Sequence, residues 1–139
     1  MDSVFLSLQN LQNLQYINLD GNAMESLDPS VFSNLPSLVH LILSNNPIRN
    51  LQPGFHWNSQ VQFIDVSNVG LKFIPTSLSQ TVRDFRCANN NLTIIHQTDF
   101  ESYPNVGLVI LDENSIDTIE DDAFGRLEFL NRLWINGNR

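Results

Sequence analysis

The side chains that most often carry out chemistry are few and scattered in this sequence. His40, His56 and His96 lie far apart, and no spacing typical of metal ligands links them. Cys87 is the only cysteine, which excludes an internal disulfide, and we expect it to be a small buried apolar residue rather than a nucleophile. Glu120–Asp122 are consecutive acids without the partner spacing of a calcium loop. The sequence therefore predicts no catalytic residue, no metal site and no cofactor, and we expect the chain not to be an enzyme.

One local motif predicts a covalent modification. Asn91-Leu92-Thr93 is an acceptor sequence for N-linked glycan, and Asn91 falls just after a predicted strand, on an exposed turn. The alternative is a chance match, because the chain is rich in asparagine. A glycan on Asn91 would place the protein in the secretory pathway.

A periodic pattern of apolar residues organises the whole chain. The unit is Leu-x-x-Leu-x-Leu-x-x-Asn, and its clearest copy is Leu38, Leu41, Leu43 and Asn46. Internal repetition at a fixed period is typical of solenoid architectures. The copies end at Asn22, Asn46, Val69, Asn90, Asn114 and Asn138, spaced by 24, 23, 21, 24 and 24 residues.

The second half of each unit repeats as well. Apolar residues recur two and five residues after each terminal position, as at Ile48 and Leu51. A phenylalanine lies fourteen residues before the next terminal position in four of the copies, at Phe32, Phe55, Phe100 and Phe124. We expect these residues to be buried as the chain returns from one strand to the next.

The spacing predicts one short strand in each unit. Residues at i and i+2 share one face of a strand, so Leu41 and Leu43 point inward together, and each unit adds one strand to a parallel sheet. No single unit covers its own apolar side, so stability comes from stacking. An asparagine amide both donates and accepts, which suits it to backbone groups at a tight bend. We expect a structural asparagine ladder of Asn22, Asn46, Asn90, Asn114 and Asn138.

Composition agrees with one folded domain over residues 1–139. The hydrophobic fraction is 42% and the charged fraction 16%, ordinary values for a globular chain. The net charge of −8 argues against a nucleic-acid surface, which needs clustered Lys and Arg. No apolar run is long enough for a membrane helix, and the first residues lack the pattern of a secretory signal.

These repeats resemble the typical extracellular subtype of leucine-rich-repeat proteins, as found in Toll-like receptor, secreted immune and Slit-type ectodomains. The resemblance rests on the 24-residue unit and on the return segment 32–38, and it covers nearly all of the chain. It implies an α/β-type repeat solenoid, a horseshoe arc with a parallel β-sheet on the concave face and an irregular or short-helical convex side. Such proteins carry cysteine-rich caps at both ends, and this chain has neither. We therefore interpret it as a fragment of about six repeats, the first and last partial, whose open ends could stack on a second copy.

The concave face is the expected ligand-binding surface. The residues between the inward apolar positions of each strand point to that face, and many of them are aromatic or apolar, as expected of a protein-binding patch. The alternative is that such residues simply suit a β-sheet. The candidate residues are Tyr16, His40, Ile42, Phe63, Asp65, Asp84, Arg86, Leu108, Ile110, Arg132 and Trp134.

The third repeat is irregular. Val69 replaces the ladder asparagine, and only 21 residues separate it from Asn90. We interpret the short repeat as variation in a tolerant scaffold rather than as a binding site. Asn68 could replace the missing asparagine through a local bulge.

Together these features predict a recognition module of an extracellular leucine-rich-repeat receptor or secreted immune protein. Its expected partner is a protein ligand or a partner receptor chain, with no nucleic acid and no membrane insertion within this segment. The alternatives are a cell-adhesion or guidance ectodomain and an intracellular scaffold or adaptor in the cytoplasm. Glycan occupancy separates the extracellular hypotheses from the intracellular one.

Overall fold

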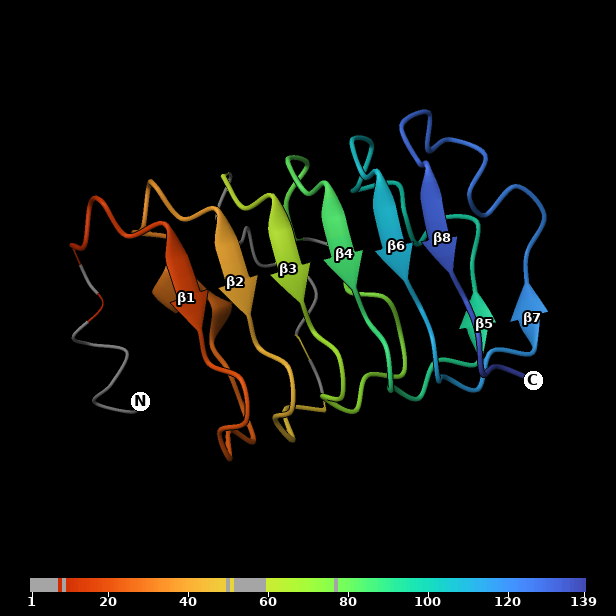
Figure 1. Cartoon of the computed structure of the whole chain (residues 1–139), viewed down its shortest axis with the longest axis horizontal. Coiled ribbons are helices and arrows are strands. Elements are labelled where there is room, and N and C mark those ends of the chain that lie inside the picture. Colours follow the sequence, from red (N-terminus) through yellow and green to blue (C-terminus); the bar gives the residue numbers. More distant parts are fainter. Residues whose placement is uncertain (1–7, 9, 50, 52–59, 77) are drawn as a thin grey trace.

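The protein is a stack of short parallel strands, one in each repeat (Figure 1). The computed structural model describes residues 8, 10–49, 51, 60–76 and 78–139, so Phe55 and His56 lie outside the described residues. The main sheet has six strands in the order β1-β2-β3-β4-β6-β8. Their bounds are β1 Tyr16–Asn18, β2 His40–Ile42, β3 Phe63–Asp65, β4 Asp84–Arg86, β6 Leu108–Ile110 and β8 Arg132–Trp134.

The other side of the stack is mostly irregular, as the resemblance to leucine-rich-repeat proteins implies. It holds a short 3₁₀-helix, η1 (Pro29–Phe32), whose first turn is capped by the Asp28 carboxylate accepting from the Ser30 N–H. It also holds a two-stranded parallel sheet of β5 (Ile94–Ile95) and β7 (Thr118–Ile119). This second sheet is not apparent from the repeat pattern. The leucine-rich-repeat arc with a parallel sheet on one face is otherwise confirmed.

The register of the six strands follows the repeat. Their middle residues pair in one row through the sheet, and this row faces the core. Leu41, Phe85 and Val109 in this row are fully buried, whereas Leu133 in the edge strand β8 is 39% exposed. The middle residues are Ile17, Leu41, Ile64, Phe85, Val109 and Leu133.

Buried asparagines join successive repeats through backbone groups. The Asn114 amide donates to the Leu111 carbonyl oxygen in its own repeat (3.1 Å) and to the Cys87 carbonyl oxygen in the preceding one (3.0 Å). Its side-chain oxygen accepts from the Leu92 N–H (3.1 Å). Asn46 and Asn138 make the corresponding contacts. Asn90 bonds to the Val66 carbonyl oxygen and the Leu71 N–H in the same way, but in its own repeat its amide donates to the Cys87 sulfur. Asn22 is exposed and donates to the Leu19 carbonyl oxygen (2.9 Å).

The residue before each of the six terminal positions has a left-handed backbone. Gly, Asn and Asp tolerate positive φ better than other residues, and five of these six positions carry Gly or Asn. Glu113, with φ of 54°, is the exception. The six positions are Gly21, Asn45, Asn68, Asn89, Glu113 and Gly137.

Aromatic side chains fill the middle of the core. Phe85 lies against Tyr103, with ring centroids 5.2 Å apart, and against Phe100 at 6.3 Å in an edge-on arrangement. Phe100 also contacts Phe124 in the next repeat, at 5.4 Å. These contacts connect three successive repeats, so the return-segment phenylalanines pack on one another as well as on the strands.

The short third repeat is bonded to the repeat that follows it. The Tyr103 hydroxyl donates to the Pro75 carbonyl oxygen, and the Ser102 hydroxyl donates to the Thr76 carbonyl oxygen. Val69 is buried, and its carbonyl oxygen accepts from the Arg49 N–H (2.7 Å). The hypothesis that Asn68 replaces the ladder asparagine is wrong.

The left-handed turn at Asn68 explains this outcome. Asn68 has a φ of 54° and is exposed, so its side chain points away from the core. Its amide instead donates to the Asn45 side-chain oxygen (2.8 Å) on the surface. Val69 keeps its place in the apolar core without a polar substitute.

Candidate binding surface

The outward side of the six-stranded sheet, called the sheet face below, carries the first and third residues of every strand. Strand alternation places them opposite the core row, and in-register pairing aligns them across the sheet. Tyr16 and Trp134 are 53% and 50% exposed, and His40, Ile42 and Phe63 are half-buried. Large apolar side chains therefore reach solvent along most of this face.

Three rings form a row across the first three strands. The Tyr16 and His40 ring centroids are 5.6 Å apart, and those of His40 and Phe63 are 5.5 Å apart. The rings are tilted by 34° and 32°. Because the three residues are register partners, the row follows directly from the pairing of β1, β2 and β3.

An ion pair lies beside this row, on β4. The Arg86 guanidinium donates through Nε to Asp84 Oδ1 (3.0 Å) and through Nη2 to Asp84 Oδ2 (3.1 Å). The same guanidinium carbon is 4.7 Å from the centre of the Phe63 ring. Hydrogen bonding to Asp84 raises the pKa of Arg86, so its charge persists at all physiological pH values.

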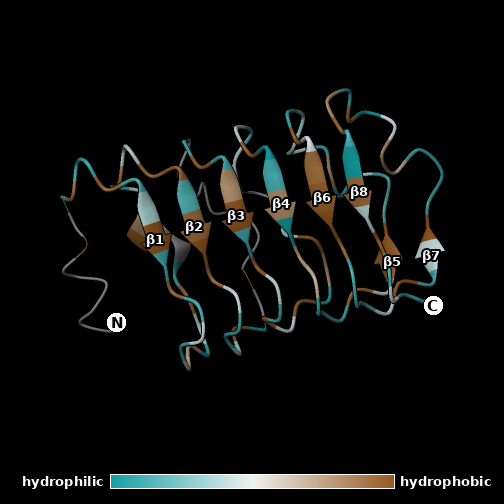
Figure 2. Cartoon of the chain, in the orientation of Figure 1, coloured by the Kyte–Doolittle hydropathy of each residue, from teal (hydrophilic) through white to brown (hydrophobic). Residues whose placement is uncertain are grey.

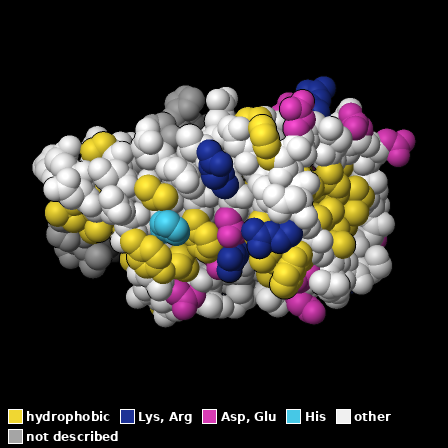
Figure 3. Space-filling view, turned by 45° about the horizontal axis from the view of Figure 1, so that its top comes forward, with side chains coloured by type: hydrophobic (Ala, Val, Ile, Leu, Met, Phe, Trp, Pro, Cys, Tyr) yellow, Lys and Arg dark blue, Asp and Glu magenta, His cyan; other side chains and the backbone are white. Residues whose placement is uncertain are grey.

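A second apolar group lies beyond the ion pair. Ile110 is half-buried on β6 and pairs with Trp134 on β8. Figure 3 shows apolar side chains on both sides of a group of Arg, Asp and Glu side chains. The expectation that Leu108 is exposed here is wrong, because only 7% of its surface is accessible. Leu108 lies between β4 and β8 at the start of a strand that is hydrophobic throughout (Figure 2).

The carboxyl ends of the strands carry a polar row. The Asp20 carboxylate accepts from the Ser44 hydroxyl (2.6 Å) and the Asn45 amide (2.7 Å), and these bonds lower the pKa of Asp20. At the other end, one Asp112 oxygen accepts from the backbone N–H of Asn136 (2.7 Å) and from its side-chain amide (3.1 Å). These hydrogen bonds hold the side chains along one border of the sheet face in place.

Comparison with known proteins agrees with this architecture. Residues 6–48 match the family model described as Leucine rich repeat. The match covers the first part of the chain, and the stacked strands continue the same leucine-rich-repeat architecture through the later repeats.

The relatives of this leucine-rich-repeat chain are much longer proteins. Podocan from Mus musculus is 26% identical over 92% of this chain and 22% of Podocan. Toll-like receptor 2 from Macaca fascicularis is 38% identical over 44% of this chain and 8% of the receptor. Among solved structures, the complex of TLR13 with ssRNA13 aligns with a TM-score of 0.78 at 22% identity, over 90% of this chain and 18% of that one. The last likeness shows the fold alone.

The predicted glycosylation site of the leucine-rich-repeat chain is exposed. Asn91 directly follows the ladder residue Asn90, and its backbone N–H donates to the Leu71 carbonyl oxygen (2.7 Å). Thr93, the third residue of the acceptor sequence, is also exposed, whereas Leu92 between them is fully buried. The backbone at Asn91 is thus held in place while its side chain reaches solvent, off the sheet face.

Two further side chains that could react, Cys87 and Tyr103, are buried in the core of the repeats. Cys87 is fully buried, and burial raises the pKa of its thiol to about 12, so it stays protonated. Tyr103 is also fully buried, and burial raises the pKa of its hydroxyl well above the usual value. Among the described residues, no group of three or more His, Cys, Asp and Glu side chains is placed to hold a metal ion.

One histidine joins two repeats on the convex side. His96 Nδ1 lies 3.0 Å from Glu120 Oε1, and the other Glu120 oxygen accepts from the Gln97 N–H (2.9 Å). The hydrogen bond with Glu120 raises the pKa of His96. Both oxygens of Glu120 are therefore engaged by the preceding repeat, and Asp121 and Asp122 beside it are exposed.

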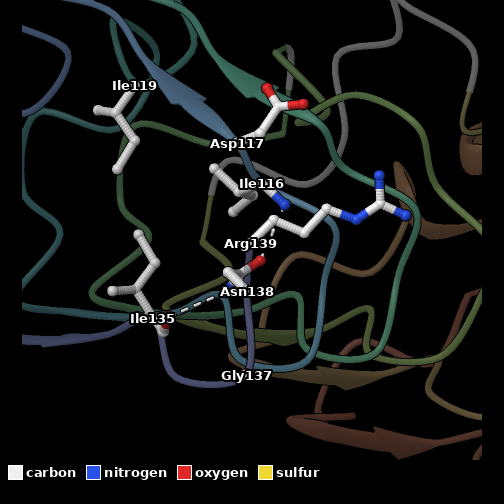
Figure 4. A pocket seen from close by; sticks show the side chains of 7 residues that line it. All are labelled: Ile116, Asp117, Ile119, Ile135, Gly137, Asn138 and Arg139. Carbon is white, nitrogen blue, oxygen red and sulfur yellow. Dashed lines mark hydrogen bonds between the residues drawn. The ribbon is translucent and has the colours of Figure 1, made fainter.

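A small cavity lies where the final repeat meets the convex return segment (Figure 4). Its volume is about 330 Å³, and three isoleucines form its apolar wall. The Asn138 side chain and the Arg139 backbone bond to Ile116 across it. The lining residues are Ile116, Asp117, Ile119, Ile135, Gly137, Asn138 and Arg139.

Over the described parts of the chain, no helix is long and apolar enough to cross a membrane.

Proposed function

We propose that this chain is a protein-recognition module of an extracellular leucine-rich-repeat protein, and that its sheet face binds the partner. The observation that carries the proposal is the row of accessible aromatic and apolar side chains on that face. Tyr16 and Trp134, each about half exposed, stand near its two ends. Aromatic anchors of this kind dominate the binding energy of protein interfaces.

A protein suits this face better than a nucleic acid. The net charge of the chain is −8, and the sheet face carries Asp65 and Asp84 against Arg86 and Arg132. Nucleic-acid surfaces need an excess of Lys and Arg to neutralise phosphates. A structural neighbour is bound to single-stranded RNA, but this chain does not offer the charge for such a ligand.

We also infer that the chain acts by binding and not by catalysis. The Cys87 thiol is buried with its pKa raised to about 12, and Arg86 on the sheet face is neutralised by Asp84. The Ser44 and Thr118 hydroxyls donate to the carboxylates of Asp20 and Asp117, and the lowered pKa of Asp20 makes its carboxylate a weak base for activating a hydroxyl.

The proposal is tested by a binding screen followed by footprinting. The purified chain is screened against a display library of secreted and cell-surface ectodomains, and hydrogen exchange is compared with and without the ectodomain that binds. We expect protection at β2, β3, β6 and β8 and unchanged exchange at β5 and β7. Protection confined to β5 and β7 would place the interface on the convex side.

We propose that Asn91 carries an N-linked glycan in the native protein. The supporting observations are the exposed Asn91 and Thr93 side chains and the position of both away from the sheet face. The test is the intact mass of the native protein before and after enzymatic deglycosylation, with Asn91→Gln as the control. A loss of glycan mass at this site supports secretion, whereas unmodified native protein in the cytosol favours an intracellular scaffold.

A further inference from the structure

The sheet face contains two apolar sites rather than one. The first anchor site consists of Tyr16, His40, Ile42 and Phe63 on β1, β2 and β3, and the second consists of Ile110 and Trp134 on β6 and β8. Between them lies the ion pair of Asp84 and Arg86, whose donor and acceptor atoms are 3.0 and 3.1 Å apart. A partner that covers the whole face must therefore bury two apolar groups and face a polar band between them.

The strand order fixes the separation of the two sites. Ile42 on β2 and Ile110 on β6 are three strand positions apart in the sheet. At about 4.8 Å for each spacing, that separation is roughly 14 Å, and Trp134, one strand further, adds about 5 Å. An extended polypeptide advances about 3.3 Å per residue, so roughly four to six residues span the two sites.

The polar band favours an extended segment over a helix. The Arg86 guanidinium uses Nε and Nη2 for Asp84, and its remaining N–H groups are free to donate to a partner carbonyl. An extended backbone presents unpaired carbonyl and N–H groups at each residue, whereas those inside a helix are already bonded to one another. An extended segment therefore satisfies the band with its own backbone while placing side chains in both anchor sites.

Charge adds a further requirement at the first anchor site. Asp65 is the register partner of Ile42, and Asp20 accepts hydrogen bonds at the border of the same site. Neither carboxylate is within ion-pair distance of a described Lys or Arg. A basic side chain next to the first apolar anchor of the partner would complement these two charges.

From these observations we infer that the sheet face binds an extended polypeptide segment that crosses the strands. The segment carries two apolar side chains four to six residues apart, one for each anchor site, and a Lys or Arg beside the first. This inference rests on the proposed function, since it assumes that the sheet face is the binding surface. It adds the class of ligand and the spacing of its anchors.

A selection from random linear twelve-residue peptides displayed on phage tests the inference directly. We expect enriched peptides to carry two aromatic or aliphatic anchors at the stated spacing. Trp134→Ser should weaken such a peptide about tenfold or more, as expected for loss of an anchor pocket, and Tyr16→Ser combined with Ile42→Ser should do the same. Removing the second anchor from the peptide should abolish the effect of Trp134→Ser. The matched control is Phe73→Ser with Phe129→Ser, which removes two exposed aromatics (71% and 59%) from outside the sheet face.

The outcomes separate the inference from the proposed function. Peptides with one anchor, or with anchors about nine or more residues apart as a helix needs, would overturn the inference. Sensitivity of such peptides to Trp134→Ser would still preserve the sheet face as the site. Peptides weakened only by the control pair would overturn both. Failure to enrich any peptide, or tighter binding of single-stranded poly(U) than of the best peptide, would also overturn the inference. Melting temperatures of all variants, measured beforehand, show that each remains folded.

Discussion

Single polar residues decide how each repeat joins the next. Asn114 satisfies two backbone carbonyl oxygens and one backbone N–H while being only 8% exposed itself. A buried backbone group without a partner is costly, so the ladder asparagine contributes more than an ordinary surface hydrogen bond. Where Val69 stands instead, the Asn90 side-chain oxygen accepts from the Val69 N–H (3.2 Å), and burial of the valine and the Arg49–Val69 backbone bond also hold the repeat.

Asn114→Ala should therefore destabilise the protein strongly. It leaves the Cys87 carbonyl oxygen and the Leu92 N–H without their partner, for which we expect a loss of about 3 kcal/mol in the free energy of unfolding. The matched control is Asn22→Ala, at the same repeat position but exposed, with an expected loss of about 1 kcal/mol or less. Urea denaturation measures the free energy of unfolding of both variants. Equal losses would show that the contribution of a ladder asparagine to stability does not depend on its burial.

The positions of the left-handed turns could also have been predicted from single residues. Gly21, Asn45, Asn68, Asn89 and Gly137 recur one position before the terminal residues, and Gly and Asn at a fixed period indicate positive φ. The cation–π contact of Arg86 with Phe63 could not have been predicted in this way. It depends on side-chain torsions, which the strand register does not determine.

At the scale of elements, three-residue strands are stable because neighbours on both sides pair with them. The apolar period predicts the positions and register of the six main strands, since a shift by one residue would turn the apolar side chains to solvent. It does not predict β5 and β7, because two-residue strands in the return segments form only when the neighbouring segments lie parallel. It also misses the burial of Leu108, which depends on what flanks it across the sheet.

The register is tested by adjacent residues of β2. Leu41→Asp places a carboxylate at a fully buried position and should abolish cooperative unfolding. His40→Asp changes the neighbouring residue on the sheet face and should cost only about 1 kcal/mol, through loss of the ring contacts. Circular dichroism during heating distinguishes them. Cooperative melting of Leu41→Asp at the wild-type temperature would mean that the strand register is wrong.

The contact of His96 with Glu120 should make the stacking of two repeats depend on pH. The pKa of His96 is raised above its usual 6.5 by the hydrogen bond with Glu120, so its contribution is complete below that pH and is lost as pH rises through the folded value. The pKa of Glu120 is lowered, so its contribution is lost as pH falls through the acidic range. The contact therefore contributes most at mildly acidic pH.

His96→Gln tests this directly. We expect the variant to be less stable than the wild type at pH 5.5 and nearly equal to it at pH 8, as measured by urea denaturation. The pKa of Asp99 is raised by burial, which also favours the folded state at low pH, and because Asp99 is present in both proteins only the part of its pKa that depends on the His96 charge differs between them. A difference in stability that is the same at both pH values would show that the pair does not titrate in the folded state.

At the scale of the whole molecule, stacking of the repeats brings residues that lie one repeat apart in the sequence side by side on one continuous surface. Each repeat contributes two or three side chains to the sheet face, and in-register pairing aligns them into rows that no single repeat could form. The rows set the spacing of the two anchor sites. The proposed function therefore depends on whether a partner binds to these rows.

The most direct test is the binding of a folded chain that lacks its sheet-face aromatics. Phe63→Ser combined with Trp134→Ser should abolish binding of the ectodomain that the wild type selects, with the melting temperature close to that of the wild type. Phe73→Ser combined with Phe129→Ser, which removes two aromatics elsewhere, should leave that binding unchanged. Wild-type affinity in the well-folded sheet-face variant would contradict the account.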